Sequence, residues 1–140
     1  MTNSPIEVRR LNADDAPRMQ AIVAMLPEPE WRDENVPSVA HLARALGDPA
    51  VFVFAAFEAG RPAGFVSAYR FPSLTKACDL VYIYDVYVAP TDQDRGVGRR
   101  LMDSVIAQCR KDGIAEAWVG TDLEYVQFEF DLAALREEGR

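Results

Sequence analysis

The sequence has few of the residues that build metal and redox sites. Its 140 residues include two cysteines and one histidine. Cys78 and Cys109 form none of the close pairs that mark zinc ligands or redox-active dithiols, so the pattern supports neither a disulfide framework nor a metal site. We therefore expect both cysteines to be reduced and structural, and no metal to take part in the function.

Long apolar runs and an excess of positive charge are also missing. No run approaches the roughly 20 apolar residues that span a bilayer, and residues 1–10 lack the apolar stretch of a signal peptide, so we expect a cytoplasmic protein with no membrane partner. With 22 acidic and 15 basic side chains, the formal net charge is −7. Nucleic acids need clustered Lys and Arg and are not expected partners. A cationic substrate would suit this charge, although acidity also serves solubility.

The composition, with 49% hydrophobic and 26% charged residues, is typical of a folded protein, and the length predicts a single domain over residues 1–140. Apolar spacing of three and four residues predicts helices that begin after Asn12, after Ser38 and near Val97. Apolar and β-branched runs predict strands at 6–11, 51–57, 62–69, 80–88, 115–121 and 126–132. This order predicts a mixed α/β layer architecture.

Some details of this architecture follow from single patterns. Residues 51–57 and 62–69 should pair as an antiparallel hairpin. The run 80–88 is apolar on both faces except for Asp85, which predicts a central strand covered on both sides. The second helix should turn Val39, Leu42 and Leu46 inward, and residues 71–79 should form a loop.

Between the strand at 80–88 and the third helix lies the turn Gln93-Asp94-Arg95-Gly96-Val97-Gly98. Two glycines one residue apart let backbone N–H groups approach a ligand, and the following helix directs its unsatisfied N–H groups and positive dipole to the same place. Arg95, Arg99 and Arg100 add positive charge to an otherwise acidic chain. An anion is the expected occupant, although an ordinary strand-to-helix loop would also use glycines to turn.

The pattern Gln93-x-x-Gly96-x-Gly98 resembles the Gln/Arg-x-x-Gly-x-Gly/Ala motif of the GNAT N-acetyltransferase superfamily, which lies after the fourth strand and opens the third helix. The resemblance implies an α/β domain of the α+β type, with a mixed, mostly antiparallel central sheet flanked by about three helices. It also implies acetyl-coenzyme A as cosubstrate, with its pantetheine arm along the strand and its pyrophosphate in the turn. The implied coenzyme-binding residues are Val86, Tyr87, Val88, Gln93, Asp94, Arg95, Gly96, Val97, Gly98 and Arg99.

The strand Val81-Tyr82-Ile83-Tyr84-Asp85-Val86-Tyr87-Val88 is similar to the Tyr-Ile-Tyr-Asp-Leu-x-Val strand of aminoglycoside 3-N-acetyltransferases. This likeness implies a small-molecule acceptor with a primary amine, such as an aminoglycoside, and a role in antibiotic resistance. Asp85 would be the base or the ammonium-binding group, and the adjacent Tyr84 is the second catalytic candidate. A carboxylate among apolar neighbours needs a use or a partner, so Asp85 could instead mark a bulge or pair with an arginine elsewhere in the fold.

After the fifth strand the sequence departs from the family. GNAT enzymes usually continue into a fourth helix and a tyrosine that protonates the leaving thiolate, whereas here residues 118–123 run almost directly into the strand-like segment 125–131. The C-terminal part is therefore predicted to be truncated, without the fourth helix. The uncovered apolar surface would favour a homodimer. The alternative function is a coenzyme-A-binding or dimeric interaction protein of the same fold with impaired catalysis.

Overall fold

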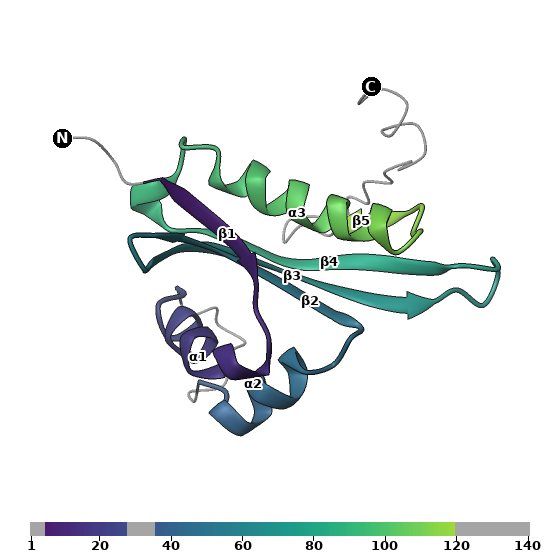
Figure 1. Ribbon diagram of the computed structural model, residues 1–140, viewed down its shortest axis with the longest axis horizontal. Helices are drawn as coiled ribbons and strands as arrows, with labels where there is room; N and C mark the ends of the chain where they lie inside the picture. Colours follow the sequence, from purple (N-terminus) through teal and green to yellow (C-terminus); the bar gives the residue numbers. More distant parts are fainter. Residues whose placement is uncertain (1–4, 28–35, 120–140) are drawn as a thin grey trace.

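The structure is a computed structural model that describes residues 5–27 and 36–119. These ranges contain five strands and three α-helices, coloured along the chain in Figure 1. Within them, no helix is both long and apolar enough to cross a bilayer. The predicted strand at 126–132 and the predicted loss of a fourth helix lie outside the described residues. The elements in chain order are β1 (Ile6–Arg10), η1 (Ala13–Asp15), α1 (Ala16–Ala24), α2 (Val39–Leu46), β2 (Val51–Glu58), β3 (Arg61–Pro72), β4 (Asp79–Val88), η2 (Pro90–Asp92), α3 (Val97–Lys111) and β5 (Ala117–Val119).

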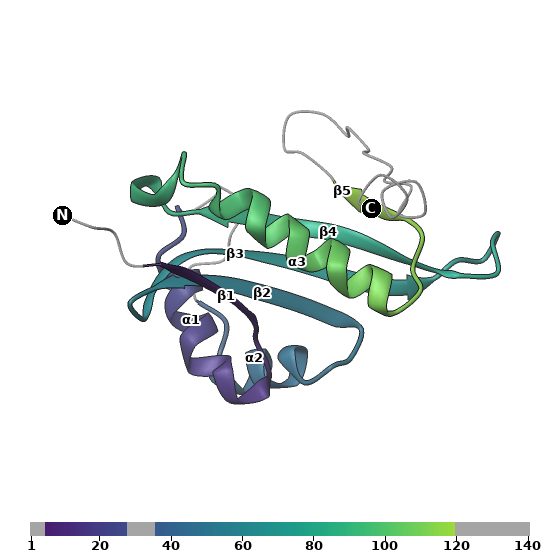
Figure 2. The same ribbon diagram turned by 45° about the horizontal axis from the view of Figure 1, so that its top comes forward.

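The five strands form one sheet in the order β1-β2-β3-β4-β5. The first four strands pair antiparallel with their neighbours, and β5 pairs parallel with β4. The helix α3 covers one face of the sheet, while α1 and α2 lie against the other (Figures 1 and 2). The predicted mixed, mostly antiparallel sheet flanked by three helices is therefore confirmed.

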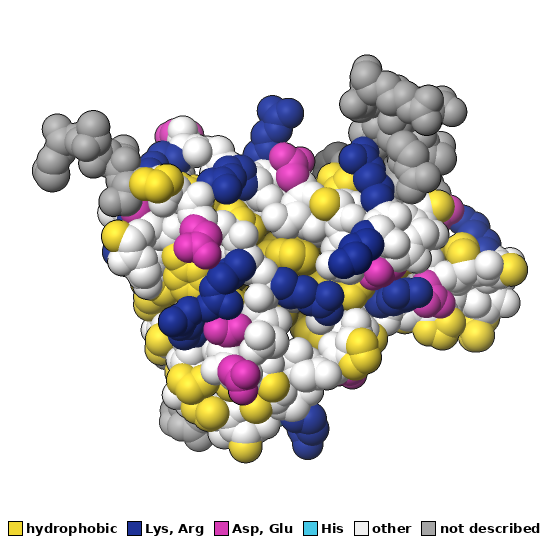
Figure 3. Space-filling view, viewed as in Figure 1, with side chains coloured by type: hydrophobic (Ala, Val, Ile, Leu, Met, Phe, Trp, Pro, Cys, Tyr) yellow, Lys and Arg dark blue, Asp and Glu magenta, His cyan; other side chains and the backbone are white. Residues whose placement is uncertain are grey.

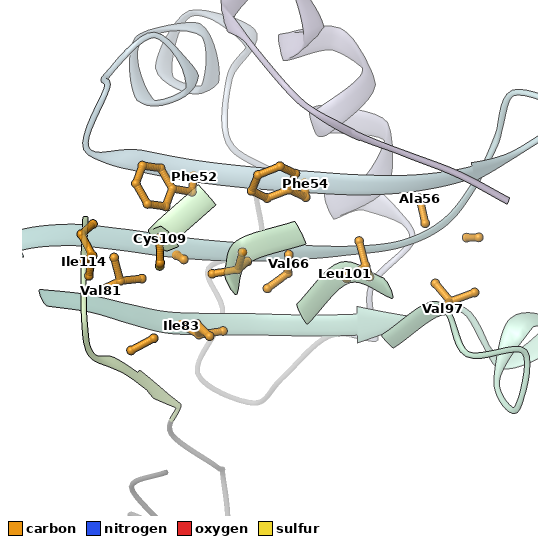
Figure 4. Close-up of a cluster of buried hydrophobic side chains, with 14 residues drawn as sticks. Phe52, Phe54, Ala56, Val66, Val81, Ile83, Val97, Leu101, Cys109 and Ile114 are labelled. Carbon is orange, nitrogen blue, oxygen red and sulfur yellow. The ribbon is translucent and has the colours of Figure 1, made fainter. Parts of the chain in front are cut away.

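The strand β2 contributes to two separate cores because its side chains alternate between the faces of the sheet. Phe52, Phe54 and Ala56 point toward α3 and pack with buried residues of that helix, as the close-up in Figure 4 shows. The residues between them belong to the second core, against α1 and α2; these are Val53, Ala55 and Phe57. Burial on both faces explains why residues 51–57 are a continuous apolar run instead of an alternating one.

The prediction that the strand at 80–88 is covered on both faces is wrong, although the strand does lie inside the sheet, between β3 and β5. The middle strand is β3. In β4 the side chains of Val81 and Ile83 are buried against α3, whereas Tyr84 is 61% exposed. The core under α1 and α2 is built mainly from β2, with Tyr87 of β4 only at its edge. The two N-terminal helices therefore leave the β4 side of this face open.

Local side-chain hydrogen bonds define the start of η1, which leads directly into α1, and the start of α2. Asn12 and Asp15 form a capping box, in which the Asn12 N–H donates to the Asp15 carboxylate over 2.9 Å. The Ser38 hydroxyl accepts a hydrogen bond from the His41 N–H at 3.1 Å. Both predicted starts are confirmed. The inward orientation predicted for Val39 is wrong, since this side chain is 39% exposed while the two leucines of α2 are buried.

Two hairpins join β2, β3 and β4. Ala59 and Gly60 form the first turn, with φ angles of 50° and 80°, as two-residue hairpin turns with left-handed residues require. The second hairpin is longer than the sequence predicted, because β3 continues to Pro72 and pairs there with Asp79. Its end projects beyond the helices in Figure 1. The predicted loop at 71–79 is therefore shortened to residues 73–78.

Candidate functional site

The turn from Gln93 to Gly98 connects η2 to α3, as the sequence predicted. Asp94 and Gly96 have φ angles of 70° and 76°, in the left-handed region. Gly96 is the N-cap of α3, and no side chain caps this end of the helix. The first N–H groups of a helix have no partners within the helix, and the macrodipole adds positive potential there. The start of α3 is therefore suited to an anionic ligand such as a phosphate.

The two glycines of the turn are needed for different reasons. Gly96 has a positive φ angle, which favours glycine. Gly98 does not have a positive φ angle, and a Cβ atom placed on it would meet only the Cγ2 atom of Val88, at an ordinary 3.5 Å. Neither backbone conformation nor packing against the described residues therefore requires a glycine at position 98. The open space above it is available to a ligand that approaches the backbone closely.

The arginines predicted to serve the turn differ in their surroundings. The Arg95 guanidinium donates hydrogen bonds to Glu58 and Asp92, and Arg100 donates to the Ile6 carbonyl. Arg99 is exposed. Lys and Arg side chains are spread over α3 and the neighbouring strands on the face shown in Figure 3, with a few acidic side chains among them. The positive charge of Arg95 is thus balanced by acids, whereas Arg99 and Arg100 are both exposed.

The remaining predicted residues of the turn lie at its two ends. The Gln93 side chain is exposed, and its Nε2 atom lies 3.5 Å from the Val88 carbonyl oxygen. The Val97 side chain is buried under α3, so only its backbone faces the turn.

Asp92 lies just before the turn and was not predicted as a site residue. Its side chain is buried and accepts hydrogen bonds from Arg61, Arg95 and Thr91. The hydrogen bonds from Arg61, aided by those from Thr91 and Arg95, hold the pKa of the Asp92 carboxyl below its usual range, although burial opposes the shift. Arg61 and Asp92 are 31 residues apart, and no local pattern marks either one, so the sequence offered no signal for this pair.

The outer edge of β4 opens beside the turn. The strand β5 pairs with Val81, Tyr82 and Ile83 of β4 and with no later residue in the described part of the chain. An unpaired strand edge presents a row of free N–H and C=O groups. The predicted coenzyme-binding residues Val86 and Val88 lie on this open stretch, which leads directly to η2 and the turn.

Asp85 lies at an irregularity in the sheet, where β3 and β4 change register. Ser67 pairs with Asp85 and Ala68 pairs with Ile83, which leaves Tyr84 as the extra residue of a β-bulge. The Ser67 hydroxyl donates to the Asp85 Oδ2 atom at 2.6 Å and accepts from the Asp85 N–H at 3.2 Å. The predicted alternative of a bulge is therefore correct. Among the described residues no arginine or lysine forms an ion pair with Asp85, which remains partly exposed.

Three tyrosines of β3 and β4 pack against one another near Asp85. The rings of Tyr69 and Tyr84 meet edge to face with centroids 6.2 Å apart, and the Tyr82 ring lies at the same distance from Tyr84. Burial, with a further contribution from the Asp85 charge, raises the pKa of the Tyr69 hydroxyl. Tyr69 and Tyr82 were not predicted as site residues, because aromatic residues in strands are usually packing residues. Here they form an aromatic surface beside an acid, which is suited to a cation.

The fold and the uncapped turn define an α/β domain in which a helix N-terminus is open to an anion and lies at the end of an open strand. The model of the acetyltransferase (GNAT) family matches residues 11–127. The chain therefore belongs to the GNAT acetyltransferase family, which makes it an acyltransferase of the N-acetyltransferase type. No curated protein matches it.

Several solved structures share the fold. An aminoglycoside acetyltransferase, HMB0005, from an uncultured soil metagenomic sample is 24% identical with a TM-score of 0.78, over 88% of this chain and 84% of that one. Another from such a sample, meta-AAC0020 in complex with sisomicin, is 24% identical with a TM-score of 0.72, over 84% of this chain and 78% of that one. The aminoglycoside N-acetyltransferase AAC(6')-Iy in complex with CoA is 18% identical with a TM-score of 0.71, over 99% and 86%. At these identities the similarity concerns the fold.

Proposed function

We propose that this chain transfers the acetyl group of acetyl-coenzyme A to a primary amine of a small molecule, with aminoglycosides as the candidate class. The proposal rests on three features that follow one another along β4 and into α3. These are the bulge that carries the Asp85 carboxylate, the stretch of strand edge that β5 does not pair, and the start of α3 without a side-chain cap. Structures of similar fold in complex with sisomicin and with CoA support the two substrates. Acetylation would turn a cationic ammonium group into a neutral amide.

The coenzyme would bind along β4 and in the turn. The proposed coenzyme-binding residues of the strand are Val86, Tyr87 and Val88. The backbone groups of Val86 and Val88 on the open edge would pair with the amides of the pantetheine arm. The N–H groups at the start of α3, over Gly96 and Gly98, would hold the pyrophosphate. The implied coenzyme ligands in the turn are Gln93, Asp94, Arg95, Gly96, Val97, Gly98 and Arg99.

Asp85 would act on the acceptor amine. Ser67 fixes one carboxylate oxygen of Asp85 by a hydrogen bond of 2.6 Å, which leaves the other oxygen for an ammonium group. In this proposal the carboxylate takes one proton from the ammonium, and the neutral nitrogen attacks the thioester carbonyl carbon. The C–S bond then breaks, and the second proton leaves the nitrogen as the thiolate is protonated. Asp85 lies about 10 Å along the strand from Val88, at about 3.3 Å per residue.

Tyr84 is the proposed proton donor for the thiolate. Its side chain is 61% exposed, and Tyr84 is the extra residue of the bulge, directly before Asp85 in the strand. Tyr69 and Tyr82 would form an aromatic wall for the acceptor cation. Replacing Tyr84 with Phe keeps the ring packing and removes only the hydroxyl, so a lower kcat with unchanged coenzyme binding is expected.

Thioester cleavage in the presence of a panel of aminoglycosides and polyamines tests the proposal. We expect acceptor-dependent release of coenzyme A by the wild type and a loss of about 100-fold or more in kcat for Asp85→Asn, since general bases contribute about 10²–10⁴. The affinity for coenzyme A should stay the same. Asp79→Asn is the matched control, because Asp79 is also on β4 and is paired with Arg70 over 2.7 Å. Exposed Cys78 should be replaced by Ser when a thiol reagent detects the product.

The outcomes separate the two candidate functions. Coenzyme binding without release for any acceptor would favour the coenzyme-A-binding protein that is the alternative. Failure of the wild type to bind coenzyme A would refute both. The homodimer predicted from the sequence also stays part of the proposal, and sedimentation of a dilute sample as a strict monomer would contradict it.

A further inference from the structure

Four charged side chains connect the turn between β2 and β3 to the glycine turn before α3. Arg61 forms two parallel hydrogen bonds of 3.0 Å with the Asp92 carboxylate and a third, of 2.9 Å, with Glu58. Arg95 donates to the same Glu58 and Asp92 oxygens that Arg61 approaches with its Nη2 atom. Glu58 ends β2 and Arg61 begins β3, whereas Asp92 and Arg95 belong to the approach to α3. We call Glu58, Arg61, Asp92 and Arg95 the charge cluster.

The charge cluster differs from an ordinary surface ion pair. The Asp92 side chain is 1% exposed, and those of Glu58 and Arg95 are 15% and 23% exposed. Two guanidinium groups face two carboxylates, so the formal charges cancel. An arginine fork that binds a carboxylate through two parallel bonds also fixes its orientation. A neutral cluster of this kind, in which Asp92 is buried while the Arg61 side chain is 46% exposed, holds geometry more than it supplies a field to a ligand.

The charge cluster holds the middle of the glycine turn, at Arg95, in place. Main-chain hydrogen bonds bound the turn on both sides, from the Asp92 N–H to Ala89 at 2.8 Å and from the Arg100 N–H to Gly96 at 3.1 Å. Between them, Arg95 stands between two left-handed residues at positions 94 and 96. A left-handed conformation is uncommon for a residue with a side chain and persists where its surroundings hold it. The Arg95 side chain is therefore an anchor between two left-handed positions, of which Asp94 is the one whose side chain disfavours that conformation.

We infer that Asp92 is a positioning residue for the coenzyme turn, and that it acts through Arg61 and Arg95 to hold the N–H groups before α3 in their binding arrangement. This inference rests on the proposed binding of coenzyme A. A turn that is not held in place must be ordered when the ligand binds, which weakens affinity. Loss of the charge cluster should therefore weaken coenzyme binding without affecting the chemical step at Asp85.

Calorimetry with coenzyme A on the full chain measures the effect. We expect Arg61→Gln to raise the Kd about tenfold, and Asp92→Asn to raise it at least as much. Arg70→Gln is the matched control, because Arg70 lies on the same strand and pairs with Asp79 and Asp112. It is about 30 Å from Arg61 along the strand, at about 3.3 Å per residue. This control should lose similar thermal stability and keep the wild-type Kd.

A lysine at position 61 separates a positioning role from a general loss of stability. Arg61→Lys keeps the charge but not the two-pronged contact, so it should restore part of the affinity. In ¹H–¹⁵N spectra without ligand, the amide signals of Gly96 and Gly98 should shift or broaden in Arg61→Gln and not in Arg70→Gln. Should Asp92→Asn fail to fold, Arg61→Gln decides, since Asp92 keeps Arg95 as a partner in that variant.

Two results would overturn the inference. One is a folded Arg61→Gln protein with the wild-type Kd and unchanged glycine signals. The other is an equal loss of affinity in Arg61→Gln and Arg70→Gln. If the wild type itself does not bind coenzyme A, the proposed function fails, and the glycine signals still report whether the charge cluster holds the turn.

Discussion

Replacement of Gly98 by leucine should separate the stability of the fold from coenzyme binding. Gly98 is the second residue of α3 and does not have a positive φ angle. Its Cβ position contacts only Val88, at 3.5 Å. The Cβ atom of a leucine would therefore fit at this position without a clash with the described residues, and we expect the rest of the side chain to extend over the turn. The same space is where the pyrophosphate is proposed to approach the backbone.

The two effects have opposite signs. Leucine is about 1 kcal/mol better than glycine in a helix interior, and less than that in the first turn, so the free energy of unfolding should stay the same or rise by up to about 1 kcal/mol. A hydrogen bond to a charged group contributes about 1.5–3 kcal/mol. Blocking one or two N–H groups of the turn should cost about 3 kcal/mol of binding, which corresponds to about 100-fold in Kd.

Urea denaturation and calorimetry with coenzyme A measure the two quantities on the same samples. Gly98→Ala adds only the Cβ atom and should fall between the wild type and Gly98→Leu. Gly64→Ala provides the contrast, because a Cβ atom there would lie 2.5 Å from the Tyr87 carbonyl oxygen, and overpacking of this kind costs about 1–3 kcal/mol of stability. Wild-type affinity in a folded Gly98→Leu protein would refute the assignment of the turn. A large loss of stability in the Gly98→Leu protein would contradict the claim that there is room for a side chain at position 98.

Two further predictions concern titration and reactivity. Hydrogen bonds from Arg9 and Arg61 hold the pKa values of Asp15 and Asp92 below the ordinary 3.8, so the stability from these carboxylates is present above that pH and is lost as the pH falls through the lowered values. Urea denaturation between about pH 2 and pH 6 should show this acid loss, reduced in Asp92→Asn, and a pH-independent stability would contradict it. Cys78 is exposed, whereas burial raises the pKa of the Cys109 thiol to about 11, so a thiol reagent should titrate one cysteine in the native protein and both in denaturant.

The order and type of the elements could be predicted from the sequence because each depends on local signals. Asn12 and Ser38 cap helices through hydrogen bonds within a few residues, and the Ala59-Gly60 turn is set by its own backbone. Local signals do not predict which face of β4 is covered by helices. Tyr84 and Val86 are exposed although aromatic or apolar, and apolar residues on a protein surface are common. A pattern of hydrophobic residues does not show which face remains open to a substrate.

The candidate site also has parts that local sequence predicts and parts that depend on residues far apart in the chain. The glycine turn could be predicted, since its residues are consecutive and their effect on the backbone is local. The partnership of Asp92 with Arg61 and of Asp85 with Ser67 could not, because each joins residues that only the pairing of distant strands brings together. The roles assigned to Asp85 and to the turn residues stay predictions until the variants are measured.

The arrangement along β4 explains why coenzyme binding and chemistry should respond to different variants. Up to Ile83 the strand is held between β3 and β5. Beyond Ile83 no described residue pairs with the outer edge, and the bulge at Tyr84 places Asp85 toward the face that α1 and α2 leave uncovered. The turn, by contrast, is fixed by the charge cluster at the far end of the strand. Asp85→Asn should therefore lower kcat at constant Kd for coenzyme A, and Gly98→Leu should raise that Kd. A double variant should show the product of the two effects, because sites that share no partners act independently.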